Sequence, residues 1–532
     1  MSNVNQENVI FGVNILETLT TGMYSDPKVI YREYIQNSCD AIDEAVESGF
    51  FDTICDGKIE IRIKNDSVVI EDNATAIPAM MFRETLYSIG NSKKTAGKSR
   101  GFRGIGHWCG FAHCEKLVFI SKARGEDVES VMECDAAKMR DMMLQHRLKR
   151  AEYSIDDVLS NTTNFSTNLV SSSVGCYFKV KMFGINDSRE ELCDEQKIRE
   201  YLSFVVPVAY ATAFHFRDTI HKYAANIDQT IHEYDITING GAVLKKYQTS
   251  FSTSKGEDSV MDVKFKQFYD DRGNLIAWMW FGVSSFRAQI VPSSIMRGIR
   301  LRSLNIQLGR ESTLQRLFNE SNGRGLYYYV GEVFSVSNDL LPDSQRNYFE
   351  PCSARTQFER VLSDFFNGEL RNIYYDGSKV GSALDKIEKA IQIEDEISLA
   401  EARGETIPDD MIKMLEDAKD KANVAEKEIE NRLRKCEERA NESNQTIADS
   451  IVKETIKRRR QQLENRQTKI KMPAANKSVN SIPIDTLSSD SRQRQPKTEK
   501  LVSLDRIYEI INKAFDPSTA KMLITKINEE LL

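Results

Sequence analysis

The spacing of apolar residues predicts that the chain begins with helices and continues into a sheet. From residue 13 to 47 apolar positions recur at helical intervals, and the Ser-Asp-Pro triplet at 25–27 is typical of a helix start. Residues 58–63 (KIEIRI) and 67–70 then alternate polar and apolar side chains or run in β-branched ones, with the Asn65-Asp66 pair between them. This pattern predicts a hairpin of two strands.

Two more strands, at residues 117–121 and 175–182, follow a glycine-rich stretch. Helices that cover one face of such a sheet give an α+β layer, which we assign to a first domain at residues 1–190. Residues 195–355 again mix strands, for example at 276–283, with helical stretches, so they predict a middle α/β domain.

The rest of the chain changes in character twice. Residues 357–466 have a helical pattern that becomes dense in Glu, Lys, Arg and Ala, as in a helical arm or coiled coil. Residues 467–500 are poor in aromatics and rich in Ser, Gln, Lys and Pro, which predicts a disordered linker. Residues 501–532 predict a pair of short amphipathic helices around Asp516-Pro517. Beyond a linker, such a pair more often docks on a partner or a second copy than on its own fold.

Composition and charge narrow the class of protein. With 532 residues, of which 40% are hydrophobic and 28% charged, the chain is long enough for several buried cores. No run approaches the roughly 18 consecutive apolar residues of a membrane-spanning helix, and the N-terminus lacks a secretory signal, so we expect a cytoplasmic protein without membrane contact. The net charge of −7 gives no global attraction for nucleic acid, although the basic run at 457–460 leaves local contact open.

The first candidate for chemistry is a polar stripe on the second predicted helix. Glu33, Asn37 and Asp40 stand at positions i, i+4 and i+7, and therefore on one face. Ile35 and the Ala41-Ile42 pair can pack into the core on the other side. This segment alone is consistent with two interpretations, a solvated face of the helix and a functional site.

The second candidate is Asp72, which directly follows a predicted strand in the segment DNATAIP at 72–78. A simple turn would explain the segment. An ionised carboxylate at the end of a strand could also accept a hydrogen bond from an exocyclic amine such as that of adenine, in an otherwise apolar pocket.

The third candidate is a loop between residues 88 and 110 that contains six glycines and five Lys or Arg residues. In its last part Gly101, Gly104, Gly106 and Gly110 precede a helix-like run. One explanation is a tight turn, and the other is that backbone amides approach a phosphate closely at a helix N-terminus. The order and spacing of the three segments, taken together, decide between a structural role and a ligand-binding role for each of them.

Together, the three segments resemble the ATP-binding motifs of the GHKL superfamily. Residues 33–41 are similar to its N-box (E-x-x-x-N-x-x-D-A), residues 72–78 to its D-N-G-x-G-I-P box, and residues 101–110 to its phosphate-gripping glycine box. Residues 88–94 resemble the start of the ATP lid in the ninety-kilodalton heat-shock chaperone, MORC and MutL branches. The resemblance implies a Bergerat-type ATPase domain that binds ATP and Mg²⁺.

The resemblance also implies roles for individual residues. Glu33 would position and deprotonate the attacking water, Asn37 would coordinate magnesium, and Asp72 would hold the adenine amine. Gly104 and Gly106 would approach the phosphates. Further candidates are Lys93, Lys94 and Arg103 for phosphate charge, and Asp40, Ala41, Ile77, Ile105 and Cys176 as other nucleotide-contacting positions of the motifs.

Two departures from the family pattern affect the adenine region. Both glycines of the second box are alanine here, Ala74 and Ala76, and each adds a methyl group beside the nucleotide. Alanine tolerates most backbone conformations except φ > 0, so the change could weaken or reshape adenine binding without abolishing it. The family's Gly-Thr pair on a late strand is matched best by Gly175-Cys176, which lacks the hydroxyl.

The resemblance extends into the middle domain, to about residue 350. Residues 331–334 (GEVF) and 340–346 (LLPDSQR) look like the chaperone-type middle segment, which ends in an arginine. In the family this arginine reaches the γ-phosphate of the neighbouring domain's ATP, which makes Arg346 a candidate electrostatic clamp. A structural salt bridge is the alternative explanation.

Three functions are consistent with these motifs. The first is an ATP-hydrolysing conformational clamp of the heat-shock-chaperone type, a homodimer that closes through its N-terminal domains and acts on a protein client or partner subunit. The second is a nucleic-acid-associated ATPase of the MORC or MutL type, for example in a cellular defence system. The third is a non-hydrolysing assembly module in which Ala74 and Ala76 have abolished turnover, and the retained Glu33 argues against it.

Overall fold

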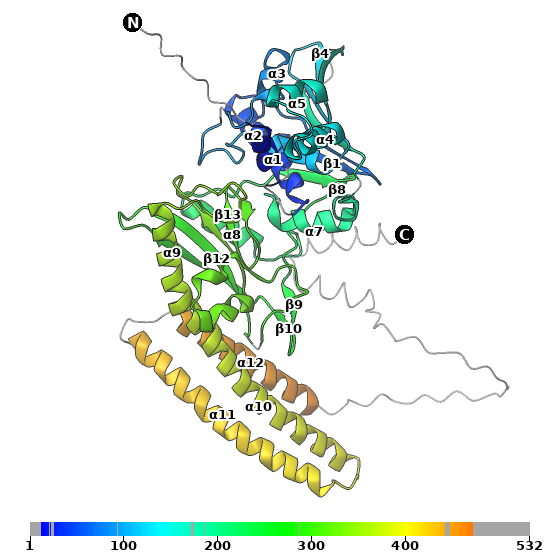
Figure 1. Cartoon of the computed structure of the whole chain (residues 1–532). Coiled ribbons are helices and arrows are strands. Elements are labelled where there is room, and N and C mark those ends of the chain that lie inside the picture. Colours follow the sequence, from blue (N-terminus) through cyan, green and yellow to red (C-terminus); the bar gives the residue numbers. More distant parts are fainter. Residues whose placement is uncertain are drawn as a thin grey trace, which may run out of the picture. The chain divides into compact units, whose positions relative to one another are not determined.

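The chain divides into a compact unit up to Lys471 and a second unit from Met472 to Leu532, and only the first unit is described below. The predicted helix pair at residues 501–532, and the predicted linker beyond residue 471, lie outside the described residues. The computed structural model (Figure 1) describes residues 12–20, 22, 26–92, 94–171, 175–185, 187–286, 288–441 and 447–471.

An eight-stranded sheet forms the centre of the first domain. Its strand order is β5-β4-β3-β6-β2-β1-β7-β8, and β1 and β2 form the predicted hairpin with Ile61 opposite Ile70. Neighbouring strands are antiparallel except β1 and β7, which run parallel. The strands are β1 (Lys58–Ile63), β2 (Ser67–Asp72), β3 (Lys116–Lys122), β4 (Val128–Asp135), β5 (Thr163–Leu169), β6 (Tyr177–Phe183), β7 (Asp235–Ile238) and β8 (Gly241–Ala242).

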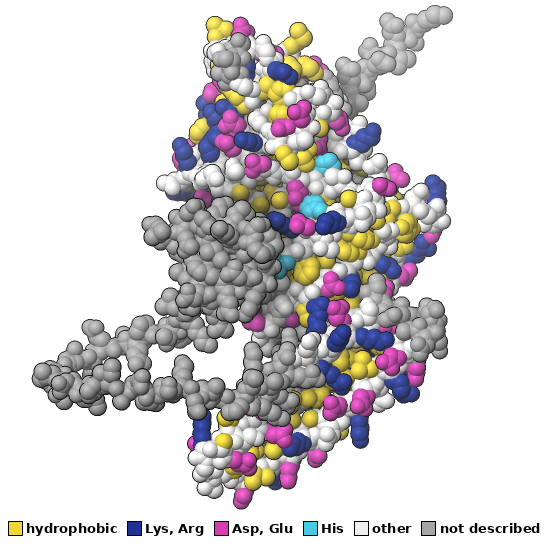
Figure 2. All heavy atoms as spheres, turned by 180° about the vertical axis from the view of Figure 1, so that it is seen from behind, with side chains coloured by type: hydrophobic (Ala, Val, Ile, Leu, Met, Phe, Trp, Pro, Cys, Tyr) yellow, Lys and Arg dark blue, Asp and Glu magenta, His cyan; other side chains and the backbone are white. Residues whose placement is uncertain are grey.

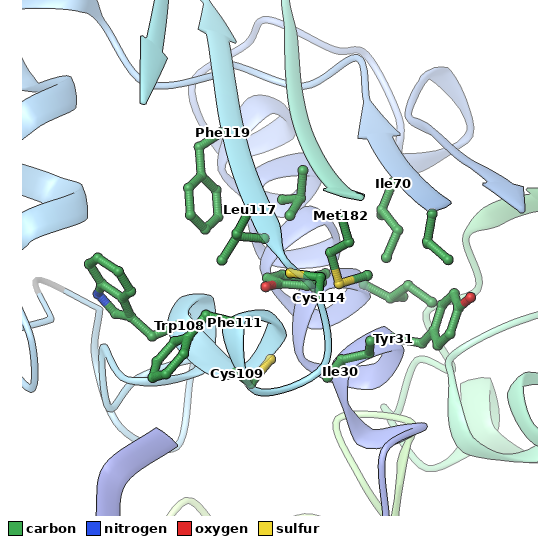
Figure 3. Packing of buried hydrophobic residues seen from close by; sticks show 14 of the residues in the cluster. Ile30, Tyr31, Ile70, Trp108, Cys109, Phe111, Cys114, Leu117, Phe119 and Met182 are labelled. Atoms are coloured by element: carbon green, nitrogen blue, oxygen red, sulfur yellow. The ribbon is translucent and has the colours of Figure 1, made fainter. Parts of the chain in front are cut away.

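The helices of this domain share one core with the sheet. Tyr31 on α2 and Trp108 and Phe111 on η2 belong to the same buried cluster as Leu117 of β3 and Met182 of β6 (Figure 3). This packing positions α2 and the glycine-rich loop that precedes η2 against each other. The helices are α1 (Val13–Thr20), α2 (Val29–Glu47), η1 (Ile54–Asp56), α3 (Ala79–Tyr87), η2 (Gly106–Ala112), α4 (Ala136–Arg147), α5 (Ile155–Thr162), α6 (Arg189–Leu192) and α7 (Glu195–Val205).

The first sheet recruits residues that the sequence assigns to the middle domain. β7 and β8 belong to the stretch 195–355, yet β7 pairs with β1, with Ile236 opposite Ile59. Ile198 of α7 also enters the core of the first domain. A short strand shows no local sign of which sheet it will join, because its partner lies far away in the sequence. The predicted boundary near residue 190 is therefore too early.

A five-stranded sheet in the order β11-β12-β15-β13-β14 forms the middle domain. Along β12, Trp278 and Trp280 enter a core shared with α8, whereas Met279 and Phe281 enter another shared with α9. Because both faces are covered, β12 is an uninterrupted apolar run. The elements are α8 (Arg217–Asn226), β9 (Ser250–Thr253), β10 (Gly256–Ser259), β11 (Asp262–Tyr269), β12 (Leu275–Val283), β13 (Gly298–Ser303), β14 (Ile306–Leu308), η3 (Thr313–Leu317), η4 (Glu320–Tyr328) and β15 (Val330–Ser335), of which β9 and β10 form a separate hairpin.

The last described region is helical: α9 (Ser353–Phe365), a π-helical turn (η5, Phe366–Leu370), α10 (Arg371–Ala402), α11 (Asp409–Asn441) and α12 (Ile447–Lys471). α12 continues to Lys471, five residues into the segment predicted as a linker from 467. Apolar residues of α10, α11 and α12 form a common core. The predicted fold class, an α+β arrangement followed by a helical region, is confirmed.

The basic run of α12 makes its contacts inside the fold. Arg459 pairs with Asp385 at 3.2 Å and with Glu388 at 2.9 Å, and Arg458 donates to the Met261 carbonyl at 3.2 Å. On the face seen in Figure 2, basic and acidic side chains of the described residues are interspersed. Within the described ranges, no helix is both long enough and apolar enough to cross a membrane.

Candidate functional site

The polar stripe of α2 is covered by the glycine-rich loop and is not a solvated face. Glu33 and Asp40 are 6% and 7% exposed, and Asn37 is half-buried. On the other side of the helix, Ile35 and Ile42 enter the core of the first domain. The helical spacing therefore separates a packing side from a side that meets the loop.

Two glycines let the loop run directly against these side chains. A Cβ atom on Gly101 would lie 2.5 Å from the Asn37 Oδ1 atom, and one on Gly106 would lie 2.7 Å from the Glu33 Oε2 atom. Carbon and oxygen normally stay roughly 3.3 Å or more apart even in their closest favourable contacts. Gly104 has a φ of +71°, the left-handed conformation that glycine adopts without strain.

Asp40 holds the loop in place through its carboxylate. Its two oxygens accept hydrogen bonds from the backbone N–H groups of Arg100 at 2.9 Å and Gly101 at 2.8 Å, and Lys94 Nζ lies 2.9 Å away. Burial by itself raises the pKa of Asp40, but Lys94, Arg100 and the two N–H groups lower it further, and the net pKa falls below the ordinary value. The predicted nucleotide contact Asp40 is thus engaged by the loop.

The Glu33 carboxylate meets cations from both domains. Arg32 Nη2 lies 3.2 Å from the Glu33 Oε1 atom, and Arg346 Nε lies 3.5 Å from the same oxygen. Arg32 also donates to the Gln345 carbonyl at 3.2 Å. The middle-domain arginine therefore reaches the candidate base within one chain.

Arg346 sits in a loop with a defined backbone. Its φ is +57°, its N–H donates to the Asp343 carbonyl at 3.0 Å, and its own carbonyl accepts from Gly309 at 2.8 Å. The Asp343 carboxylate accepts from the N–H groups of Asn347 at 3.0 Å and Tyr348 at 3.1 Å. These bonds present the Arg346 side chain, which is 6% exposed, toward the first domain.

A cavity lies where α2, the glycine-rich loop and this middle-domain loop meet. It brings together predicted residues of the first motif, of the glycine-rich loop and of the middle segment, and adds His107 and Ser344. Arg103 borders it as well and donates to the Pro342 carbonyl at 2.7 Å. The lining residues are Glu33, Asn37, Gly101, Arg103, Gly104, Ile105, Gly106, His107, Ser344 and Arg346.

Asp72 does not line this cavity. The carboxylate is 2% exposed, accepts from the Ser38 hydroxyl at 2.7 Å and from the Ala74 N–H at 3.2 Å. Burial raises its pKa to about 6, although both hydrogen bonds act in the opposite direction. Asp72 is the last residue of β2, which extends past the predicted strand at 67–70, and its acceptor oxygens are closed off by its own neighbours.

The two alanines of the second box differ in backbone conformation. Ala76 has a φ of +59°, which alanine adopts only at a cost, whereas Ala74 has no positive φ and its methyl group is fully buried in the core. Ile77 exchanges backbone hydrogen bonds with the Ser121 hydroxyl, at 2.8 Å and 2.7 Å. The turn thus keeps a glycine-type geometry without a glycine at position 76.

The other predicted nucleotide contacts are dispersed. Ala41 packs against the core of the first domain. Cys176 stands just before β6, two residues from Phe178, the register partner of Asp72. Burial raises the pKa of the Cys176 thiol. Lys94 pairs with Asp40, and Lys93 lies outside the described residues.

Sequence reasoning missed three residues of this region. Arg32 neighbours Glu33 in the sequence, and Ser38 lies within the first motif, so adjacency to the motifs could have identified both. Arg100 was counted only as one of five basic residues of the loop, and no local pattern marks it as buried at 4% exposure.

Residues 24–165 match the family of histidine kinase-, DNA gyrase B- and HSP90-like ATPases. The matched stretch contains α2, the Asp72 segment and the glycine-rich loop. This stretch of the first domain is therefore similar to the ATPase domains of the GHKL superfamily, a class whose members bind ATP, typically with Mg²⁺. No curated protein matches the chain.

Proposed function

We propose that this protein hydrolyses ATP and acts as an ATP-gated conformational clamp. The observation that carries the proposal is the ion pair between Arg346 and Glu33, 3.5 Å apart, at a cavity shared by two domains. A catalytic carboxylate on one domain and a cation on the other can be productive only when the two domains are correctly docked. The rate of hydrolysis would therefore depend on how the two domains are docked.

The residues around the cavity fit the parts of a phosphoryl-transfer site. Backbone N–H groups near Gly104 and Gly106 can approach phosphate oxygens, because glycine has no side chain of its own to hold them apart. The Asn37 amide oxygen suits Mg²⁺, which prefers oxygen ligands and, when bound, neutralises phosphate charge. Glu33 would orient the attacking water and accept its proton, and Arg346 would stabilise the charge that develops on the phosphate.

The same contacts support gating by nucleotide. Arg346 pairs with Glu33, and a phosphate group in the cavity would compete for this guanidinium because it carries more negative charge than a carboxylate. ATP would thereby withdraw Arg346 from the Glu33 carboxylate, which keeps its ion pair with Arg32, and draw the Arg346 loop toward the phosphates. We include closure as a homodimer through the first domains, and action on a protein client or partner subunit, in the proposal.

A comparison of two full-length variants tests the site. Glu33→Ala should lower turnover by about 10²- to 10⁴-fold, since general-base assistance is lost, while ATP affinity survives. Arg346→Ala should also slow turnover. Arg217→Ala is the matched control, because Arg217 lies on the surface of α8 in the same domain and pairs with Asp218 at 3.4 Å. Turnover by Glu33→Ala at the parental rate would disprove the proposed role of Glu33.

Two further results would select another function. Turnover stimulated by DNA or RNA would favour a nucleic-acid-associated ATPase, although the basic run of α12 makes contacts within the fold. Calorimetric ATP binding by the parent without phosphate release would establish a non-hydrolysing assembly module.

A further inference from the structure

Arg100, in the glycine-rich loop, joins three parts of the first domain. Its Nη1 atom donates to Asp43 Oδ2 at 2.6 Å, its Nη2 atom donates to the Tyr234 hydroxyl at 2.9 Å, and its backbone N–H donates to Asp40 Oδ1 at 2.9 Å. The side chain also stacks over the Tyr234 ring, 5.1 Å from the centroid. At 4% exposure, Arg100 is held in one conformation by partners on several sides.

The same residue contacts the middle domain at two places. The Arg100 Nε atom donates to the Leu304 carbonyl at 3.2 Å, and the Arg100 carbonyl accepts from Arg346 Nη2. One residue therefore links α2, which carries Glu33, to the side chain of the candidate clamp. Arg103 of the same loop also contacts the Arg346 segment, since it donates to the Pro342 carbonyl at 2.7 Å, but Arg100 contacts the Arg346 side chain itself.

The turn that presents the Leu304 carbonyl is firmly anchored. Leu304 and Asn305 have φ values of +47° and +61°, and together they connect β13 to β14. The Asn305 side chain accepts from Lys245 Nζ at 3.0 Å and donates to the His232 carbonyl at 2.7 Å. Asn305 tolerates the left-handed conformation better than most residues, so the anchor and the turn geometry are compatible.

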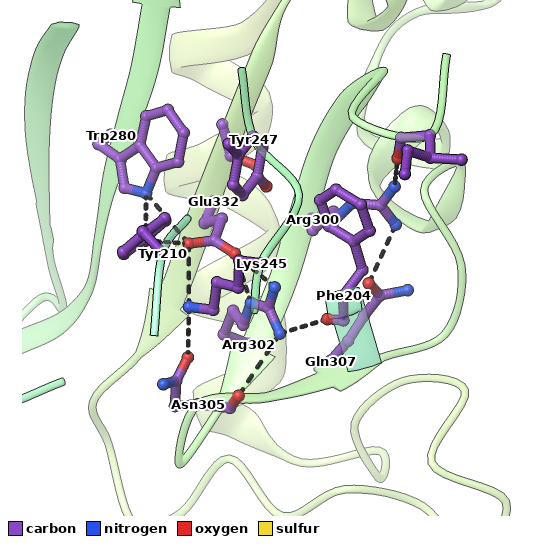
Figure 4. A network of polar contacts seen from close by, with 12 residues as sticks. Phe204, Tyr210, Lys245, Tyr247, Trp280, Arg300, Arg302, Asn305, Gln307 and Glu332 are labelled. Atoms are coloured by element: carbon purple, nitrogen blue, oxygen red, sulfur yellow. Dashed lines mark hydrogen bonds and ion pairs between the residues drawn. The ribbon is translucent and has the colours of Figure 1, made fainter. Parts of the chain in front are cut away.

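Behind Asn305 lies a fully buried ion network of the middle domain (Figure 4). Lys245 Nζ lies 3.6 Å from Glu332 Oε2, and Arg302 Nε donates to Glu332 Oε1 at 2.7 Å. Burial by itself raises the pKa of Glu332, but Arg302 and Lys245 lower it to about 2, so the carboxylate stays ionised. A charged network inside a core permits few alternative arrangements, which makes the turn a rigid support for Arg100.

We infer that Arg100 is a positioning residue that holds the Arg346 side chain at the nucleotide cavity by docking the glycine-rich loop on the Leu304–Asn305 turn. The inference rests on the proposed function, because it assigns Arg100 a role in hydrolysis through Arg346. Arg100 is not among the residues that line the cavity with Glu33 and Asn37. Its loss should leave ATP binding intact and slow the chemical step.

The variant Arg100→Lys tests the inference in the full-length protein. Lysine keeps a positive charge beside Asp40 and Asp43, but it cannot donate in three fixed directions as a guanidinium does. We expect ATP affinity within about threefold of the parent and turnover lowered on the order of 10²-fold, as misplacement of a catalytic group typically costs. Arg140→Lys is the matched control, because Arg140 donates to the Cys114 carbonyl at 2.7 Å and to the Phe111 carbonyl within the first domain.

Two readouts separate positioning from a merely structural role. If Arg100 acts through Arg346, the double variant Arg100→Lys/Arg346→Ala should turn over no more slowly than Arg346→Ala alone. Hydrogen exchange of amides 343–350, without nucleotide, should accelerate on the order of tenfold in Arg100→Lys and stay unchanged in Arg140→Lys. Asn305→Gly keeps the turn conformation but removes the anchor, and it should reproduce the Arg100→Lys result.

The outcomes distinguish this inference from the proposed function. Unchanged exchange at 343–350 in Arg100→Lys, or turnover effects that multiply in the double variant, would overturn the role of Arg100. Failure of the parental protein to bind or hydrolyse ATP would overturn the proposed function. Faster exchange in the variant would in that case still show that Arg100 docks the loop.

Discussion

Burial affects the carboxylates of the proposed nucleotide site in different ways, depending on their partners. Asp40 is buried beside Lys94 and Arg100 and its pKa is lowered, whereas Asp72 is buried with only a hydroxyl and an N–H as hydrogen-bond donors and its pKa rises to about 6. A buried charge is stable only when cations or several donors compensate for lost hydration. Of these two carboxylates, Asp72 is therefore the one whose protonation changes in the mildly acidic range.

We predict that Asp72→Asn removes a pH-dependent loss of stability. Because the pKa of Asp72 is about 6 when folded and 3.8 ordinarily, the folded chain binds the proton more tightly than the unfolded chain. The free energy of unfolding of the parent should therefore fall, relative to that of Asp72→Asn, as the pH rises from about 4 to about 6. Urea unfolding of both proteins across this range measures the difference, and parallel curves would contradict the prediction.

Asp72→Asn should also abolish ATP binding if Asp72 holds the adenine amine. A hydrogen bond to a charged acceptor contributes about 1.5–3 kcal/mol, so affinity should drop by at least tenfold. Calorimetry at pH 7.5, where Asp72 is ionised, is the measurement. Asp56→Asn is a suitable control, because Asp56 caps the short helix η1 on the surface. Equal affinity of parent and Asp72→Asn would remove Asp72 from the site.

At Ala76, we predict that glycine stabilises the fold. Replacing a non-glycine residue with φ > 0 by glycine relieves strain of about 1 kcal/mol. Ala74→Gly is the matched control: it removes a buried methyl group without relieving strain, so it should destabilise by about 1 kcal/mol. Thermal or urea unfolding distinguishes the two signs, and a destabilised Ala76→Gly protein would show that its methyl group packs favourably.

At the level of elements, the site depends on how closely the glycine-rich loop approaches α2. The atoms that a new Cβ would meet at Gly101 and Gly106 are the ends of the Asn37 and Glu33 side chains. Such ends can move aside more easily than backbone. The close approach of the loop to α2 therefore affects the positions of the Asn37 and Glu33 oxygens more than it affects the stability of the fold.

We predict that Gly101→Ala and Gly106→Ala lower turnover on the order of 10²-fold while the melting temperature changes little. The added methyl groups displace the Asn37 and Glu33 oxygens, and displacement of about 1 Å can cost that much. Gly368→Ala is the control, because a Cβ there meets nothing within 4 Å. Full turnover in both loop variants would mean that the loop yields instead of the side chains.

At the scale of the whole molecule, two domains line the cavity of the proposed site. The second unit of the chain bears on a separate matter, namely whether the protein associates with a second copy or a partner. We predict that truncation at residue 495 leaves ATP binding intact but lowers the mass measured by light scattering or abolishes partner capture in a pull-down. The reason is the amphipathic pattern of residues 501–532, which predicts helices with apolar sides to cover. Unchanged mass and unchanged capture would favour a cap on the fold.

Local sequence patterns predict the structure correctly wherever the spacing of residues along one helix or strand determines which side chains share a face. Glu33, Asn37 and Asp40 follow helical periodicity on α2, Asp72 ends β2, and glycines mark the loop before η2. Helix and strand periods are intrinsic to the backbone, so the sequence by itself determined these elements and the ATPase motifs that they carry.

Only the tertiary structure decided which distant groups meet. Arg346 reaches Glu33, Arg100 bridges to Leu304, and β7 completes the first sheet, each through contacts between residues far apart in the chain. The positive φ of Ala76 and the closed surroundings of Asp72 likewise depend on neighbours outside their own segments. Such contacts result from the packing of whole layers of helices and strands. The pattern of hydrophobic residues along the sequence does not specify which polar groups from different layers will face each other.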